Sequence, residues 1–120
     1  MSVTVSYSRD VNPALPTFIA GTFPRVTAKR TVVSGAGALV AGSVLGKVTA
    51  DGKLRLSLAA ATDGSEDVYA VLAEDIDATS ADKDATVYLS GEFRAAGLTL
   101  GTGHTAASTR DAARALGIYY

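Results

Sequence analysis

The carboxylates of Glu74, Asp75 and Asp77 are the side chains whose type and spacing could best support chemistry, because they follow directly on the apolar run 70–73. Clustered carboxylates bind hard cations such as calcium, and paired carboxylates carry out acid–base catalysis. On an extended strand successive side chains point to opposite faces, so Asp75 and Asp77 share a face that Glu74 does not. Two carboxylates on one face fall short of the roughly six to eight oxygens that calcium takes.

The next residues add Asp82 and Asp84, but without EF-hand spacing and without a glycine at which a calcium loop could turn. An acid–base pair needs a carboxyl pKa raised by burial, whereas DIDATSADKD is polar. We therefore interpret 74–84 as a solvated strand end and loop. The candidates for ion pairs, within the chain or between subunits, are Glu74, Asp75 and Asp77 with Arg55 and Arg94. The alternative is a small β ligand- or metal-binding domain that uses this acidic segment.

Other patterns that could carry chemistry are weaker. The chain has no cysteine, which excludes thiolate nucleophiles, disulfides and zinc–thiolate sites. The one histidine, His104 in GTGHTA, is interpreted as a solvated or capping residue, because catalysis needs a nucleophile beside it. The glycines of SGAGALVAG do not fit a dinucleotide or P-loop spacing. Lys53 is expected at the start of a strand, not at a hairpin tip where a carrier lysine would stand. We predict no catalytic residue, cofactor or metal, and no enzyme.

Strand patterns dominate the elements that would position these residues. From Phe23 onward, short apolar or alternating runs are separated by polar and glycine-rich turns, which is typical of a β-rich domain. SGAGALVAG and DATSADKDA are expected to be loops, and GLTLGTGHTA a strand followed by a loop. The predicted strands are RVTAKRTVV at 25–33, VYAVLA at 68–73 and TVYLSGEFR at 86–94, to which a central hairpin adds two more.

The hairpin surrounds Asp51-Gly52, a dipeptide typical of tight turns. Its register can be predicted by asking which side chains each loop length would place on the same face. A three-residue loop pairs Val48 with Leu54 and Gly46 with Leu56, so that one face is apolar and the other polar. We therefore predict this register.

One helix is predicted, over STRDAARALG at 108–117. Ser108 with Asp111 three residues later resembles a capping box, which makes Ser108 the expected N-cap. Ala112, Ala113 and Leu116 form a narrow apolar stripe, and Gly117 is a suitable C′ residue.

Residues 1–22 differ from the rest and predict an extended N-terminal arm. The start alternates apolar and polar residues, and the two prolines that follow block a helix. A segment of this kind could add as a strand to the edge of a partner's sheet. No signal-peptide pattern and no run of roughly 18 apolar residues is present, so we expect synthesis in the cytoplasm and no membrane contact. The arm residues expected to make contacts are Val3, Val5, Tyr7, Pro13, Leu15, Pro16 and Phe18.

Chain length and net charge further limit the class of protein. The 120 residues suggest one domain, and the net charge of −1 argues against a nucleic-acid binder. Charge is unevenly distributed, because residues 1–50 carry five basic and one acidic residue whereas residues 51–93 carry three basic and ten acidic ones. These segments either neutralise each other within the fold or meet across an interface.

Four features that follow one another along the chain are shared with a known family. They are the hairpin GSVLGKVTADGKL, the strand DGSEDVYAVLA with its acidic continuation, the strand YLSGEFR, and a short arginine-bearing helix before GIYY. Together they resemble the head decoration, or capsid-stabilising, proteins of tailed bacteriophages, the lambda decoration protein D-like family. The resemblance covers roughly residues 23–120.

The resemblance implies a mainly β fold: a small β-clip-like or partly open barrel domain over 23–120, with one short C-terminal α-helix and the extended arm 1–22. It implies a homotrimer that binds the major capsid protein on the outer surface of the expanded phage head. Bound at local threefold positions, the trimer would stabilise the shell against the pressure of the packaged DNA. The arm would add to the β-structure of the coat. Another virion structural module is the remaining alternative.

Overall fold

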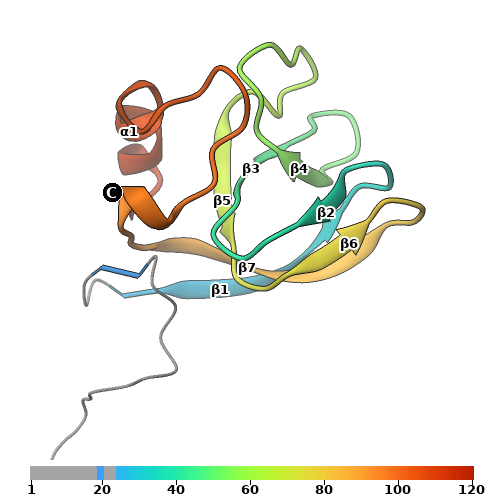
Figure 1. Ribbon diagram of the computed structural model, residues 1–120, viewed down its shortest axis with the longest axis horizontal. Helices are drawn as coiled ribbons and strands as arrows, with labels where there is room; N and C mark the ends of the chain where they lie inside the picture. Colours follow the sequence, from blue (N-terminus) through green and yellow to red (C-terminus); the bar gives the residue numbers. More distant parts are fainter. Residues whose placement is uncertain (1–18, 21–23) are drawn as a thin grey trace, which may run out of the picture.

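The protein folds into eight short strands, a 3₁₀ turn and one helix in a computed structural model that describes residues 19–20 and 24–120. Figure 1 shows their arrangement. In chain order they are β1 (Val26–Val32), β2 (Gly37–Leu39), β3 (Val44–Lys47), β4 (Leu54–Leu56), β5 (Val68–Leu72), β6 (Ile76–Ala78), β7 (Lys83–Glu92), η1 (Ala95–Gly97), α1 (Ala106–Ala115) and β8 (Ile118–Tyr119).

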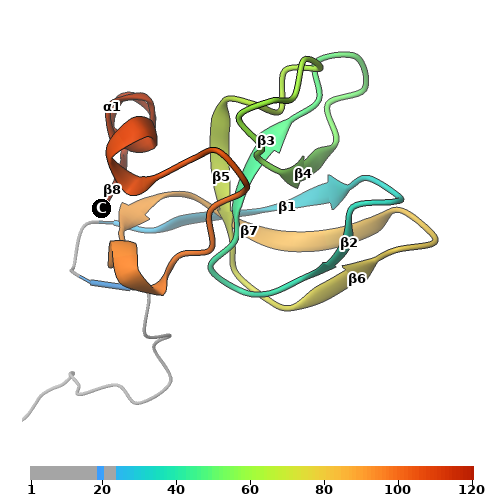
Figure 2. The same ribbon diagram turned by 45° about the horizontal axis from the view of Figure 1, so that its top comes forward.

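Five of these strands close into a barrel. Neighbours pair in the order β1, β4, β3, β5 and β7, and β7 pairs back to β1. The β1–β7 seam is a long antiparallel ribbon, whereas the β1–β4 seam is parallel and holds the single register pair Val32 with Leu54. The predicted mainly β fold is confirmed, and the barrel that the resemblance implied as β-clip-like or partly open is closed. In Figures 1 and 2, α1 and η1 lie at one end and the β6–β7 turn lies at the other.

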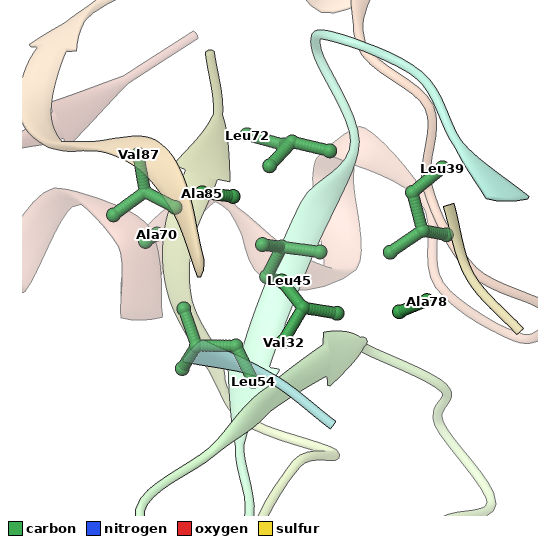
Figure 3. Close-up of a cluster of buried hydrophobic side chains, with 9 residues drawn as sticks. All are labelled: Val32, Leu39, Leu45, Leu54, Ala70, Leu72, Ala78, Ala85 and Val87. Carbon is green, nitrogen blue, oxygen red and sulfur yellow. The ribbon is translucent and has the colours of Figure 1, made fainter. Parts of the chain in front are cut away.

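The barrel interior is a cluster of buried aliphatic side chains. Leu45, Leu54 and Leu72 are its largest fully buried members. The β2–β6 pair lies against the barrel and adds Leu39 and Ala78 to the same cluster (Figure 3). Small side chains complete it, so a chain rich in alanine and valine fills this narrow space.

A second cluster covers the outside of β3 and β5. Val44 and Val71 belong to it, although their neighbours Leu45 and Leu72 face the barrel interior. Ala113 of α1, Ile118 of β8 and Phe93 are further members. The two central strands are therefore buried on both faces.

This two-sided burial explains why the predicted hairpin register was wrong by one residue. In the structure Lys47 pairs with Leu54 and Leu45 with Leu56, and the Val48 N–H donates to the Lys53 carbonyl at 2.8 Å. The prediction assumed one apolar and one polar face, which does not hold for a strand between two cores.

Two segments that the sequence predicted as loops contain strands. SGAGALVAG includes β2, and the 77–85 segment includes the end of β6 and the start of β7. The pairing of β2 with β6 allows Leu39 and Ala78 to be buried, and this tertiary gain outweighs poor local strand propensity. The strand expected after Gly97 was wrong, since Thr99 makes only an isolated bridge to Ser43.

Helix α1 begins earlier than predicted. Thr105 is the N-cap: its side chain accepts the Ser108 N–H at 3.0 Å, and the Thr105 N–H donates to the Ser108 hydroxyl at 2.9 Å. Ser108 is therefore the N3 partner of the capping box and not the cap. Of the predicted stripe Ala113 is buried but Leu116 is 46% exposed, and Gly117 follows the helix with φ of 86°, as expected of a C′ glycine. No helix in the described ranges is long and apolar enough to cross a membrane.

Candidate functional site

Glu74 and Asp75 bind neighbouring segments of the same chain. The Thr86 N–H of β7 donates to Glu74 Oε2 at 2.7 Å, and Lys29 Nζ of β1 lies 3.8 Å from the same oxygen. Asp75 Oδ1 instead accepts the Ala41 N–H, at 2.7 Å, from the β2–β3 connection. The two adjacent carboxylates therefore have different partners, at a bend between β5 and β6 and not on the continuous strand that the sequence suggested.

Asp77 and Asp84 make local and cross-strand hydrogen bonds. Asp77 Oδ1 accepts the Thr79 N–H at 3.0 Å and also the Thr79 hydroxyl, which closes the turn after β6. Asp84 Oδ1 accepts the Thr31 hydroxyl at 2.9 Å across the β1–β7 ribbon. Both carboxylates lie on the surface: Asp77 fixes the turn after β6, and Asp84 links β7 to β1.

Asp82 connects three loops. Its Oδ1 accepts the Ser34 N–H at 2.7 Å from the β1–β2 turn, and its Oδ2 lies 2.6 Å from Lys53 Nζ, just before β4. Because Asp82 itself stands in the β6–β7 turn, one side chain holds three turns that are far apart in sequence. Lys53 was predicted to start a strand; it directly precedes β4, which begins at Leu54.

The electrostatics of these carboxylates follow from their hydrogen bonds. The Thr86 N–H lowers the pKa of Glu74, the Thr79 hydroxyl lowers the pKa of Asp77, and Lys53 lowers the pKa of Asp82. An acid–base catalyst working near neutral pH would need the opposite shift. Glu74, Asp77 and Asp82 therefore serve as ionised acceptors that fix loops.

The predicted arginine partners are in different positions. Arg55 Nη1 lies 3.6 Å from Asp63 Oδ2, so its acidic neighbour in the chain is outside the 74–84 segment. Arg94 is exposed and directly precedes η1. Within residues 19–20 and 24–120, no group of three or more His, Asp or Glu side chains is arranged to hold a metal ion. Ion pairing between subunits stays a prediction.

His104 is half-buried, and its side chain joins two loops. Its Nε2 lies 2.9 Å from the Glu66 carbonyl oxygen and 3.1 Å from the Ser57 hydroxyl. Since a carbonyl can only accept, we assign the proton to Nε2. In this tautomer Nε2 cannot act as a base toward Ser57, whose hydroxyl is also 3.1 Å from the Glu66 carbonyl.

The arm residues proposed for contacts, Val3 to Phe18, lie outside the residues that the structure describes. The described part of the predicted arm begins at Ile19, which forms an antiparallel bridge with Phe93 and is only 9% exposed. The Ala20 N–H donates to the Glu92 carbonyl at 3.0 Å. Ile19 and Ala20 therefore pack against the end of β7 (Figures 1 and 2). Sequence reasoning missed this contact, for which the apolar Ile19 after two prolines was the only signal.

A model of a known protein family matches most of this chain. The family model described as "Bacteriophage lambda head decoration protein D" matches residues 12–118, which spans the barrel, α1 and the residues at the base of the arm. The chain belongs to this family. No curated protein matches the chain.

Membership identifies the protein as a structural component of the phage virion associated with the capsid. The family is one of head decoration proteins and not an enzyme family. The carboxylates described above act within the chain, where they hold loops and turns together.

Proposed function

We propose that this protein binds the outside of the expanded phage capsid as a homotrimer at local threefold positions and stabilises the shell against DNA pressure. The observation that carries the proposal is the family match over residues 12–118. It includes both the folded barrel and part of the predicted arm, so the two would act together.

Stabilisation of this kind needs no catalysis. A ligand that binds only the intact shell shifts the equilibrium toward that shell, by about 2.7 kcal/mol per site at a free concentration a hundredfold above Kd. A trimer that presents three arms would bind more tightly than one arm alone, because the later contacts are intramolecular. Many weak contacts with the major capsid protein would thus hold neighbouring coat subunits together.

The arm provides the proposed contact with the coat. Alternating apolar residues at 3–7 could pair with the edge of a coat-protein sheet, where backbone hydrogen bonds give affinity and alternate side chains give specificity. The prolines would keep the following stretch extended. The contact residues proposed are Val3, Val5, Tyr7, Pro13, Leu15, Pro16 and Phe18.

The closed barrel supports this role by its rigidity. Its hydrogen-bonded ring has no open edge between β1 and β7, and its carboxylates hold the turns from within the chain. A preformed scaffold loses little conformational freedom on binding, which favours affinity.

Binding to purified heads tests the proposal. Expanded, DNA-free heads that lack the decoration protein should bind the full chain, and unexpanded heads should bind it much more weakly. Light scattering after size-exclusion chromatography should give the mass of a trimer. Removal of residues 1–18, which retains the buried Ile19, should preserve the trimer and weaken binding to expanded heads. A monomer at micromolar concentration, or equal binding by the truncated chain, would contradict the trimer or the arm contact respectively.

A further inference from the structure

The end of β7 and the residue that follows it contact the described residues that lead into β1. Ser90, Gly91, Glu92 and Phe93 are consecutive, and each meets residues between positions 19 and 26. The chain around β8 occupies the other edge of residues 90–93. There the Gly91 and Phe93 N–H groups donate to the Gly117 and Tyr119 carbonyls. The contacts therefore lie along one defined strand edge.

Ser90 makes two of these contacts with one hydroxyl. The Val26 N–H donates to Ser90 Oγ at 3.2 Å, and the hydroxyl donates to the Pro24 carbonyl at 3.0 Å. The β1–β7 register shifts between Val26 and Thr27, so regular ladder bonding is interrupted at this point. The hydroxyl bonds on both sides of Arg25 and so fixes the chain path into β1.

Gly91 makes room for the same segment. Its φ is 151°, and a Cβ there would lie 3.0 Å from Arg25 Cγ and 2.9 Å from Phe93 Cζ. Both contacts are closer than ordinary packing allows, so the missing side chain lets the Arg25 stem and the Phe93 ring approach the backbone.

Glu92 and Phe93 hold the residues further from the barrel. The Ala20 N–H donates to the Glu92 carbonyl at 3.0 Å, and Ile19 bridges Phe93. Ile19 and Phe93 are 9% and 3% exposed and belong to the cluster that also contains Ile118. Ile19 is therefore anchored by both a backbone bridge and apolar packing.

We propose that Ser90–Phe93 is an arm-docking segment, which fixes the point and direction at which residues 1–18 leave the domain. The inference rests on the proposed capsid contact of the arm. In this role Ser90 is a positioning residue that acts through Pro24, Val26 and the chain before them. If docking were lost, the chain length between barrel and coat would grow from 18 to 25 residues. Effective concentration falls as about the −3/2 power of that length, about 1.6-fold per arm, which gives a roughly threefold loss for the two arms that bind after the first.

The experiment compares Ser90→Ala with Ser90→Thr, which keeps the hydroxyl, and with Ser80→Ala, a matched change in the exposed β6–β7 turn. Each variant is made in the full chain and in the chain lacking residues 1–18. Dissociation constants are measured with expanded, DNA-free heads that lack decoration protein. We expect Ser90→Ala to weaken binding up to about threefold in the full chain only, with Ser90→Thr and Ser80→Ala near the unsubstituted protein.

A second measurement keeps the test independent of capsid binding. Amide hydrogen exchange of the free protein should become faster at Ala20 in Ser90→Ala, while exchange at Leu45 and Leu72 stays unchanged. Ala20 bonds to Glu92 and not to Ser90, so faster exchange there reports release of the docked segment as a unit. Ile19→Ala, which weakens the same contact from the arm side, should act in the same way.

Unchanged exchange at Ala20 in both variants would overturn the docking segment, and so would an equal loss of head binding with and without residues 1–18. The second result would show that Ser90 serves barrel stability alone. Heads that fail to bind even the unsubstituted protein would instead overturn the proposed function, and the exchange measurement would still decide the docking contact.

Discussion

Asp82 Oδ2 lies 2.6 Å from Lys53 Nζ, which joins the β6–β7 turn to the start of β4. The other carboxylate oxygen of Asp82 accepts the Ser34 N–H. Residues far apart in sequence are thus held at one end of the barrel by a single side chain. This contact defines the first prediction.

Asp82→Ala should lower the Tm by a few degrees, because it removes both hydrogen bonds and leaves the Ser34 N–H without its carboxylate partner. Asp67→Ala is the matched control, since Asp67 is an exposed acid in a different turn. Thermal unfolding followed by circular dichroism checks the difference. Equal Tm values for the two variants would show that Asp82 does not connect the turns.

Acid should destabilise the fold through the same class of contacts. Hydrogen bonds from Ser65, Thr79 and Lys53 lower the pKa values of Asp63, Asp77 and Asp82 below the ordinary 3.8. A lowered folded-state pKa contributes stability that is present above the unfolded-state value and is lost as pH falls through the folded-state value. We expect the urea midpoint to be flat from pH 7 to about 5 and to fall below about pH 4. A midpoint that stays constant down to pH 3 would contradict this.

Gly46→Ala should be strongly destabilising, because a Cβ at this position would overlap the Ser65 carbonyl group, which is backbone and cannot move aside as a side chain can. Overpacking of a tight site costs about 1–3 kcal/mol, which denaturant unfolding can measure. Gly52→Asn is the control: nothing lies within 4 Å of a Cβ there, and asparagine tolerates its φ of +72°. Similar losses in the two variants would show that the Gly46 contact with Ser65 is not tight.

The capping box of α1 gives a prediction that distinguishes the observed N-cap, Thr105, from the N-cap expected from the sequence, Ser108. Thr105→Ala should cost about 1 kcal/mol, because it removes the acceptor for the Ser108 N–H. Thr105→Ser retains the hydroxyl and should be nearly neutral. If Thr105→Ala were neutral in denaturant unfolding while Ser108→Ala cost the expected cap energy, the helix would begin at Ser108 after all.

The elements that could be predicted from sequence are those whose local pattern agrees with their tertiary setting. β5 is a continuous apolar run because it is buried on both faces, and the predicted strand 86–94 covers most of β7. Gly117 was predicted as a helix end because its positive φ is a local requirement.

The failures arose where distant residues decide. The register between β3 and β4 depends on the second cluster outside Val44, which no hairpin pattern reveals. β2 becomes a strand only because β6 pairs with it. The acids at 74–84 were correctly interpreted as surface residues, but their partners are mainly backbone N–H groups and hydroxyls, which sequence does not mark as charge does. The docking of Ile19 on Phe93 is likewise a long-range contact.

The central claim is that the protein stabilises the shell by binding it, and the most direct test is the thermal disruption of expanded heads with and without the protein. Heads that lack the protein are incubated with increasing concentrations of the full chain, or of the chain without residues 1–18, and their disruption temperature is followed by light scattering. We predict that the full chain raises this temperature until its sites are saturated and that the shortened chain raises it less at equal concentration. If the full chain is shown to saturate its sites on the heads and their disruption temperature does not change, the account is contradicted.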